Sequence, residues 1–314
     1  MKQRIQILLI VMTCCCSVAA ERRYTSTYYT DNHFLELGGG VGYSALFENI
    51  PELTTLGNIA GTISLGYEYR IKGFWINFSA ELQFLSATST FGISGTDKWI
   101  YDTQGKQALM HYDFNQSLDR QEFLFVNLPV VLGYYYRGLY IGAGAKIGYC
   151  VLAQESTTLK YSTSATYHQY VDDFSAMSDH YYTTYLSSVT ENLNSKYKLS
   201  AIAEIGYDVL AYSREMNHDN RSGLKISVVA EYGLNNLINT NAELPLYSFN
   251  ESNAAELFIH PFYNTNAAQS YRIHPLYVGM RISWIFNIGV RKCPWCNVYG
   301  NHRNYRNRYN RIQH

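Results

Sequence analysis

Ionisable side chains recur at alternate positions within apolar stretches of this 314-residue sequence. In residues 276–284, every even position holds Leu, Val, Met, Ile or Trp, whereas Arg281 has the opposite parity. Because successive side chains of a β-strand point to opposite faces, charged residues of one parity share a face. On that face they could form ion pairs or a path for ions or protons. The charged residues of this parity are Glu36, Glu68, Arg70, Glu81, Lys146, Glu204, Lys225, Glu231 and Arg281.

These charges are nearly balanced, since five are carboxylates and four are cations. Ions removed from water are costly unless they are paired. The balance therefore predicts a structural network of salt bridges across a closed interior, and it favours that network over a path for a substrate or protons. Bulky residues on the same face predict that the interior is occluded; they are Trp75, Tyr140, Ile202, Val229, Tyr277 and Ile285.

A second chemical motif is Cys293-Pro294-Trp295-Cys296, which has the spacing of a redox pair. It lacks the strand-to-helix context that lowers a thiol pKa, so a local disulfide between Cys293 and Cys296 is the simpler prediction in an oxidising compartment. Zinc binding by the two thiols with His302 is the alternative, although a fourth ligand is not evident.

Catalysis would need a nucleophile beside a base, such as Ser with His. The histidines fall mostly in predicted loops and have no motif spacing. Asp172-Asp173 could bind a cation, but a solvated loop is the simpler interpretation. The sequence therefore predicts no enzyme, no cofactor and no metal site.

The elements that would position these residues are eight alternating strands. They are predicted near residues 33–46, 58–70, 74–88, 121–136, 138–153, 196–211, 224–236 and 273–287. Tight-turn residues join some of them, whereas 89–120, 154–195 and 237–272 are long connections rich in Ser, Thr, Asn and Tyr. This asymmetry is typical of an all-β, eight-stranded, antiparallel up-and-down transmembrane β-barrel with long external loops.

The apolar parity decides between a membrane barrel and a soluble one. The interior of an eight-stranded barrel is just filled by its side chains. The apolar residues at alternate positions of the eight strands are too many to fit inside. Residues such as Leu128, Val130 and Leu132 are therefore predicted to face lipid. After the N-terminal region, no apolar run is long enough for a transmembrane helix.

The first residues have the features of a secretory signal peptide. Lys2 and Arg4 precede an apolar stretch, and small residues follow at 17–20. We expect a signal peptide at 1–20, an N-terminal periplasmic segment at 21–32, an outer-membrane barrel at 33–290 and a basic, Asn- and Tyr-rich periplasmic tail at 291–314. A lipoprotein acylated at Cys14, Cys15 or Cys16 is the alternative, but none has the usual small residues before it.

Two consecutive segments resemble a known family. They are Phe125-Val126-Asn127-Leu128-Pro129-Val130-Val131-Leu132-Gly133-Tyr134 and Leu139-Tyr140-Ile141-Gly142-Ala143-Gly144-Ala145-Lys146-Ile147-Gly148-Tyr149. A Pro-containing strand followed by a Gly-rich strand resembles the small outer-membrane barrels of the OmpA transmembrane-domain type and, more closely, the PorT-like barrels. The resemblance implies an architecture and no catalytic residue.

The expected role is structural or interactive, through the external loops of an outer-membrane barrel with an occluded lumen. The alternatives are a narrow channel or secretion-apparatus component of the PorT-like kind and, third, a lipid-modifying envelope enzyme. Expected partners are outer-membrane lipid and proteins at the external loops or the tail. Lys and Arg together equal Asp and Glu, so no nucleic-acid partner is indicated. Oligomeric state is not indicated by the sequence.

Overall fold

The structure is a computed structural model. It describes residues 27–29, 33–48, 53–71, 73–92, 95–101, 105, 107–166, 180–209, 222–238, 244–250, 256–266, 268, 271–288 and 290–292. The chain divides into two units, residues 31–288 and the two terminal segments together. In the terminal unit, β1 (Thr27–Tyr29) pairs antiparallel with β14 (Val290–Lys292). The predicted signal peptide, Asp172-Asp173 and residues 293–314 of the predicted tail, with Cys293, Cys296 and His302, lie outside the described residues.

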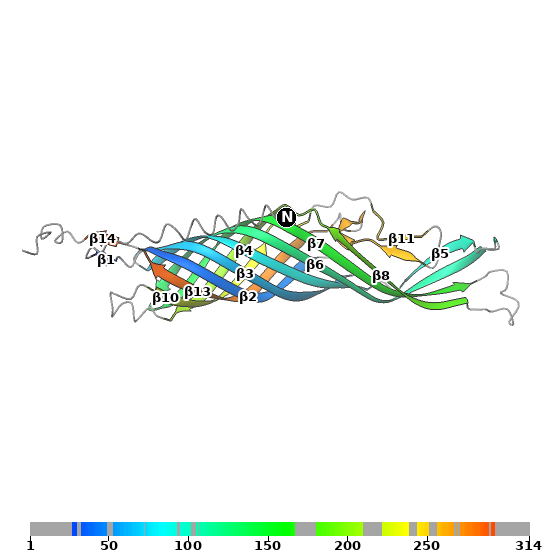
Figure 1. The fold of residues 1–314 in the computed structure, drawn as a ribbon, viewed down its shortest axis with the longest axis horizontal. Helices are drawn as coiled ribbons and strands as arrows, with labels where there is room; N and C mark the ends of the chain where they lie inside the picture. Colours follow the sequence, from blue (N-terminus) through cyan, green and yellow to red (C-terminus); the bar gives the residue numbers. More distant parts are fainter. Residues whose placement is uncertain are drawn as a thin grey trace, which may run out of the picture. The chain divides into compact units, whose positions relative to one another are not determined.

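The main unit contains a closed ring of eight antiparallel strands (Figure 1). Each strand pairs with the next one along the ring, and the last pairs with the first. The predicted up-and-down barrel is therefore confirmed. In order, the ring strands are β2 (His33–Glu48), β3 (Leu53–Ile71), β4 (Phe74–Phe91), β6 (Gln107–Tyr136), β7 (Leu139–Thr166), β9 (Tyr197–Asp208), β10 (Ser222–Gly233) and β13 (Ile273–Asn287).

Because side chains alternate along each strand, the charged residues point into the barrel and the apolar residues point outward, the reverse of a soluble barrel. On β6, Leu128, Val130 and Leu132 are 62%, 39% and 59% exposed, and the residues between them point into the barrel. We call the exposed apolar surface of the ring the apolar band; on β7 it reaches from Leu139 to Leu152. A soluble barrel would bury these residues, whereas a lipid bilayer requires them on the outer face.

Two tight connections define one end of the barrel, which we call the turn end. Arg137 and Gly138, between β6 and β7, both have positive φ, at 50° and 91°. Two positive φ values are the signature of the type I′ turn, which matches the twist of a hairpin. The β3–β4 connection uses Gly73 with φ 88°, a conformation that glycine adopts without strain.

At the opposite end, which we call the sheet end, the strands continue well beyond the apolar band. Residues 107–120 and 154–166 are parts of β6 and β7, so the prediction that they are loops is wrong. Strand β5 (Gly95–Tyr101) pairs with β6, and β8 (His180–Asn192) pairs with β7. These four elements form a four-stranded sheet that we call the outer sheet (Figure 1).

The outer sheet has its own apolar core on its inner face. The short hairpin of β11 (Tyr247–Phe249) and β12 (Leu257–Ile259) supplies Leu257 and Ile259, which pack with Met110, Tyr112 and Tyr161. Beyond the hairpin is the short 3₁₀ helix η2 (Phe262–Asn264). Within the described residues, no helix has the length and apolar character needed to cross a membrane.

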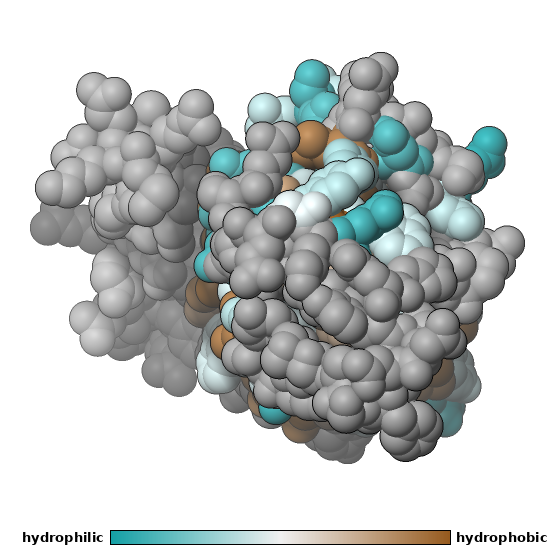
Figure 2. Space-filling view, turned by 90° about the vertical axis from the view of Figure 1, so that its right-hand side faces the viewer, coloured by the Kyte–Doolittle hydropathy of each residue, from teal (hydrophilic) through white to brown (hydrophobic). Residues whose placement is uncertain are grey.

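Polar side chains dominate the other face of the outer sheet. On β7 this face carries Gln154, Ser156, Thr158, Lys160 and Ser162. In the view onto the sheet end, the visible described residues are mostly hydrophilic or intermediate (Figure 2). The change from apolar to hydroxyl-bearing side chains along one face of β7 therefore marks where the strand leaves the hydrocarbon.

Candidate functional site in the barrel lumen

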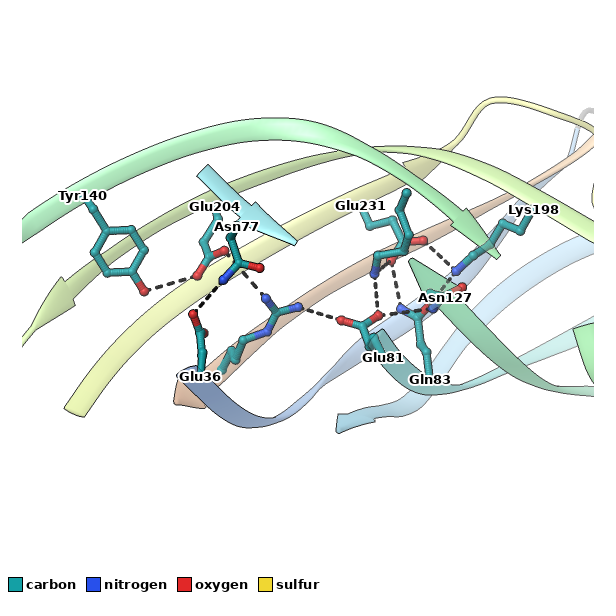
Figure 3. A network of polar contacts seen from close by, with 11 residues as sticks. Glu36, Asn77, Glu81, Gln83, Asn127, Tyr140, Lys198, Glu204 and Glu231 are labelled. Carbon is teal, nitrogen blue, oxygen red and sulfur yellow. Dashed lines mark hydrogen bonds and ion pairs between the residues drawn. The ribbon is translucent and has the colours of Figure 1, made fainter. Parts of the chain in front are cut away.

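The alternation that exposes apolar residues brings the charged residues together inside the barrel. All nine charged residues of the predicted network lie in the lumen, together with Lys198 and Asp208. Eight of the nine are buried, and the side chain of the ninth, Arg70, is 12% exposed. They come from strands around the ring. Figure 3 shows part of this set, with Glu36, Glu81, Lys198, Glu204 and Glu231 pointing into the space between the strands.

The cluster nearer the sheet end is centred on two carboxylates that share a lysine. Lys146 Nζ lies 2.6 Å from Glu81 Oε1 and 2.7 Å from Glu231 Oε2. Lys198 Nζ lies 2.6 Å from the other Glu231 oxygen. Charges at this separation, shielded from water, attract strongly. Strands β4, β7, β9 and β10 are thus joined through the middle of the lumen.

Amide side chains add hydrogen bonds to the two carboxylate oxygens that Lys146 contacts (Figure 3). Asn127 Nδ2 donates to Glu81 Oε1 at 3.2 Å and to Gln83 Oε1 at 2.9 Å. Gln83 Nε2 donates to Glu231 Oε2 at 2.9 Å, and Gln83 Oε1 accepts from Lys198 Nζ. Hydrogen bonds to charged groups are the stronger kind, so the amides hold the ionised forms in place.

Arg281 connects this cluster with a third carboxylate closer to the turn end. Its Nη2 lies 2.8 Å from Glu81 Oε2, and its Nη1 lies 3.6 Å from Glu204 Oε2. Tyr140 Oη donates to Glu204 Oε1 at 3.2 Å. One guanidinium therefore bridges two levels of the lumen.

A second cluster fills the turn end. Lys225 Nζ lies 2.7 Å from Glu68 Oε2 and 3.2 Å from Glu36 Oε2. Arg70 Nε lies 2.5 Å from Glu68 Oε1, and its Nη2 lies 3.5 Å from Asp208 Oδ2. Every cation in this cluster therefore contacts two carboxylates.

Aromatic rings close the space around the second cluster. The Arg70 guanidinium lies 4.4 Å from the ring centroids of both Phe34 and Tyr135, and Lys225 Nζ lies 4.4 Å from that of Tyr140. Trp75 packs edge-on against Tyr140, with centroids 5.7 Å apart. Cations over ring faces are stabilised, and the rings leave little room for ions to pass.

Two glycines make room for the Trp75 ring. A Cβ added at Gly133 would lie 2.5 Å from Trp75 Nε1, and one added at Gly142 would lie 2.5 Å from Trp75 Cζ2. These residues face each other across the β6–β7 ladder. The Gly-rich character of these strands therefore has a packing reason inside the lumen.

Lys198 and Asp208 were missed by reasoning from the sequence. Both are on β9 and share the parity of Glu204, so the same alternation could have identified them. Their inclusion gives this ion-pair network six carboxylates and five cations among the described residues.

Other chemistry is sparse in the described part of the chain. No group of three or more His, Cys, Asp or Glu side chains there could hold a metal ion. Ser248 Oγ lies 3.1 Å from His260 Nε2, but no carboxylate among the described residues hydrogen-bonds to Nδ1 of that histidine. Cys150 is a buried, free thiol.

Comparison with known proteins gives similarities of architecture. No protein-family model matches the chain, and no curated protein matches it. Among solved structures it is similar to Neisserial surface protein A (6% identity, TM-score 0.30, 82% of this chain and 97% of that one). It is also similar to the outer membrane protease OmpT from Escherichia coli (9%, 0.30, 84% and 99%). A third is the translocator domain of the autotransporter NalP from Neisseria meningitidis (6%, 0.22, 90% and 95%).

Proposed function

We propose that this protein is a non-conducting outer-membrane barrel that holds the outer sheet outside the membrane for binding to another polypeptide. The observation that carries the proposal is the lumen network, because each cation in it contacts at least one carboxylate and the rings of Trp75 and Tyr140 lie beside the second cluster. An ion moving through would have to displace these pairs, which are costly to separate.

The outer sheet is the part suited to a partner. Strand β8 pairs on one side with β7 and, within the described residues, with no strand on the other side. It contains no proline and no lysine, the residues that commonly protect an edge strand from pairing. Leu186, in the middle of β8, is 71% exposed. Such an edge supports binding of an extended peptide segment by strand addition.

Conductance tests the closed lumen. The purified full chain in planar bilayers should show no steady openings, because the paired charges and rings occupy the path. Reproducible, ion-selective openings that change when Arg281 is replaced by Ala would support the alternative, a narrow channel or secretion-apparatus component.

Photo-crosslinking tests the binding surface. A photoreactive residue at Leu186 should give discrete protein adducts on intact cells, whereas the same residue at Leu132, in the apolar band, should not. Adducts at neither position, or equally at both, would contradict a role for the β8 edge.

A catalytic role has less support. Ser248 and His260 form a nucleophile–base contact, but a third group that orients the histidine is the usual requirement. An unchanged lipid profile in cells that carry Ser248→Ala is the expected result.

A further inference from the structure

Two carboxyl groups face each other inside the barrel, above the apolar band. Asp119 on β6 and Glu155 on β7 are both 0% exposed. Their strand neighbours Arg120 and Gln154 point outward and are polar, so this level lies beyond the hydrocarbon. The pair is separate from the lumen network described above.

The pair is surrounded by hydrogen-bond donors. Thr157 Oγ1 donates to Asp119 Oδ1 at 2.7 Å, and Gln121 Nε2 donates to Asp119 Oδ2 at 2.6 Å. The backbone N–H of Tyr263 lies 3.3 Å from each oxygen of Glu155, and the N–H of Phe262 also bonds to it. A hydrogen bond joins the two carboxyl groups themselves.

No described cation pairs with either carboxyl group. On the neighbouring strand β8, the residue opposite Glu155 is Glu191, another carboxylate. Glu191 accepts a hydrogen bond from Asn264 Nδ2 at 3.0 Å. From β4, the Cα partner of Asp119 is the uncharged Ser89. The η2 segment contributes Tyr263, whose N–H faces Glu155. Two buried, adjacent negative charges without a counter-ion repel strongly, so one proton between them is required.

Burial raises the pKa of both groups. Burial raises the pKa of Asp119 above its usual value. Burial and the neighbouring Asp119 raise the pKa of Glu155 well above its usual value. A carboxyl–carboxylate pair titrates as one unit, and here the singly protonated form persists to higher pH than for a free carboxyl group.

A proton suits this site better than a metal ion. The groups turned toward the two carboxyls are the Thr157 hydroxyl, the Gln121 amide nitrogen and two backbone N–H groups. Donors stabilise anionic oxygen, whereas a calcium or magnesium ion requires oxygen ligands. Among the described residues, no cluster of three acidic, His or Cys side chains gathers for a metal.

The segment that touches Glu155 covers the sheet end of the lumen. Phe262 and Tyr263 are 3% and 0% exposed and belong to one apolar cluster with Phe123 and Phe125. The Phe125 ring in turn lies 4.6 Å from Lys198 Nζ in the lumen network. We propose that Asp119 and Glu155 share one proton and thereby fasten residues 261–265 over the lumen, so that alkaline loss of the proton releases this segment.

The direction of the pH effect follows from linkage. The closed form binds the proton more tightly than the released form, in which the carboxyl groups are hydrated. Stabilisation of the closed form is therefore complete below the ordinary carboxyl pKa and is lost as pH rises through the raised pKa. Between the ordinary carboxyl pKa and the raised pKa, one proton is released for each opening.

Hydrogen–deuterium exchange of the full chain in lipid nanodiscs tests the proposal. Protection of the amides in 256–266, corrected for intrinsic exchange, should fall by about tenfold per pH unit between the ordinary carboxyl pKa and the raised pKa of the pair, and should level off above it. In Glu155→Gln, the amide oxygen still accepts from the Tyr263 N–H, and the amide nitrogen donates to Asp119 in place of the shared proton. Amide protection in 256–266 should therefore be independent of pH in this variant. Glu155→Ala should lose protection at every pH.

The control is Glu122→Gln, which removes a carboxylate on the outer face that pairs with Arg120 at 2.7 Å; it should keep the wild-type pH profile. A flat wild-type profile, or a Glu155→Gln profile with the wild-type slope, would overturn the proposal. So would protection that depends on calcium and is lost with EDTA at constant pH, because that result identifies a cation site. If Glu155→Gln does not fold, Asp119→Asn provides the same comparison.

Discussion

At the scale of single residues, the lumen charges depend on one another. Arg281 contacts both Glu81 and Glu204, and Glu81 also forms an ion pair with Lys146. Removing one member of a buried set leaves its partners as uncompensated charges in a medium that solvates them poorly. A single substitution therefore affects several strands.

Arg281→Ala should destabilise the barrel by about 3–5 kcal/mol, because two buried carboxylates lose their shared cation. The measurement is urea-induced unfolding in lipid vesicles. Arg120→Ala is the matched control: its side chain is 53% exposed and pairs with Glu122 on the outer face, so its effect should be about 0–1 kcal/mol. Equal effects of the two substitutions would contradict a structural role for the network.

The sequence identified nine of the charged residues that share the lumen and missed Lys198 and Asp208. It could not predict which of these residues pair with each other. Parity depends only on position within a strand, whereas pairing depends on the register between strands. Asp119 and Glu155 could not be identified either, because they lie in segments that were predicted as loops. The side chains of a loop cannot be assigned to an inner or an outer face.

At the scale of elements, each ring strand has one face in the apolar band and the other in the polar lumen. Val130 and Val278 are 39% and 41% exposed within the apolar band, while the neighbouring Val131 and Tyr277 are buried inside. The fold therefore requires the apolar alternation that made all eight strands recognisable from sequence.

Val130→Arg and Val278→Arg should each cost about 2–4 kcal/mol near the bilayer centre and less near an interface. Thr158→Arg is the control, because Thr158 points outward on β7 but lies above the apolar band. Folding into vesicles, followed by the gel shift between heated and unheated samples, measures the difference. Full tolerance of both valine substitutions would show that these positions do not face lipid.

The outer sheet could not be predicted because its sequence lacks that contrast. In 157–164 the inner face carries Thr157, Leu159 and Tyr161, and the outer face carries hydroxyl groups and Lys160. Thr occurs on both faces of this segment, so the contrast between an apolar and a polar face is weak. The strands persist there because they continue ladders that begin in the membrane and because β11 and β12 cover one face.

At the scale of the whole molecule, the two ends of the barrel differ in kind. The turn end closes with tight connections, and the sheet end carries the outer sheet and η2. In barrels of this class the short connections face the periplasm and the long ones face outward.

An epitope tag inserted after Gly105, between β5 and β6, should therefore be labelled on intact cells. A tag after His314 should be labelled only once the outer membrane is permeabilised, because β13 ends at the turn end. Labelling of the C-terminal tag on intact cells would reverse the orientation.

The ladder between β6 and β7 runs from Tyr136 and Leu139 at the turn to Leu109 and Thr166 in the outer sheet, and two bulges interrupt its register. A partner that pulls on the outer sheet along its strands would load this ladder in shear, so that many hydrogen bonds resist together rather than one after another. Force applied to the outer sheet would then pass directly into the barrel wall through the β6–β7 hairpin.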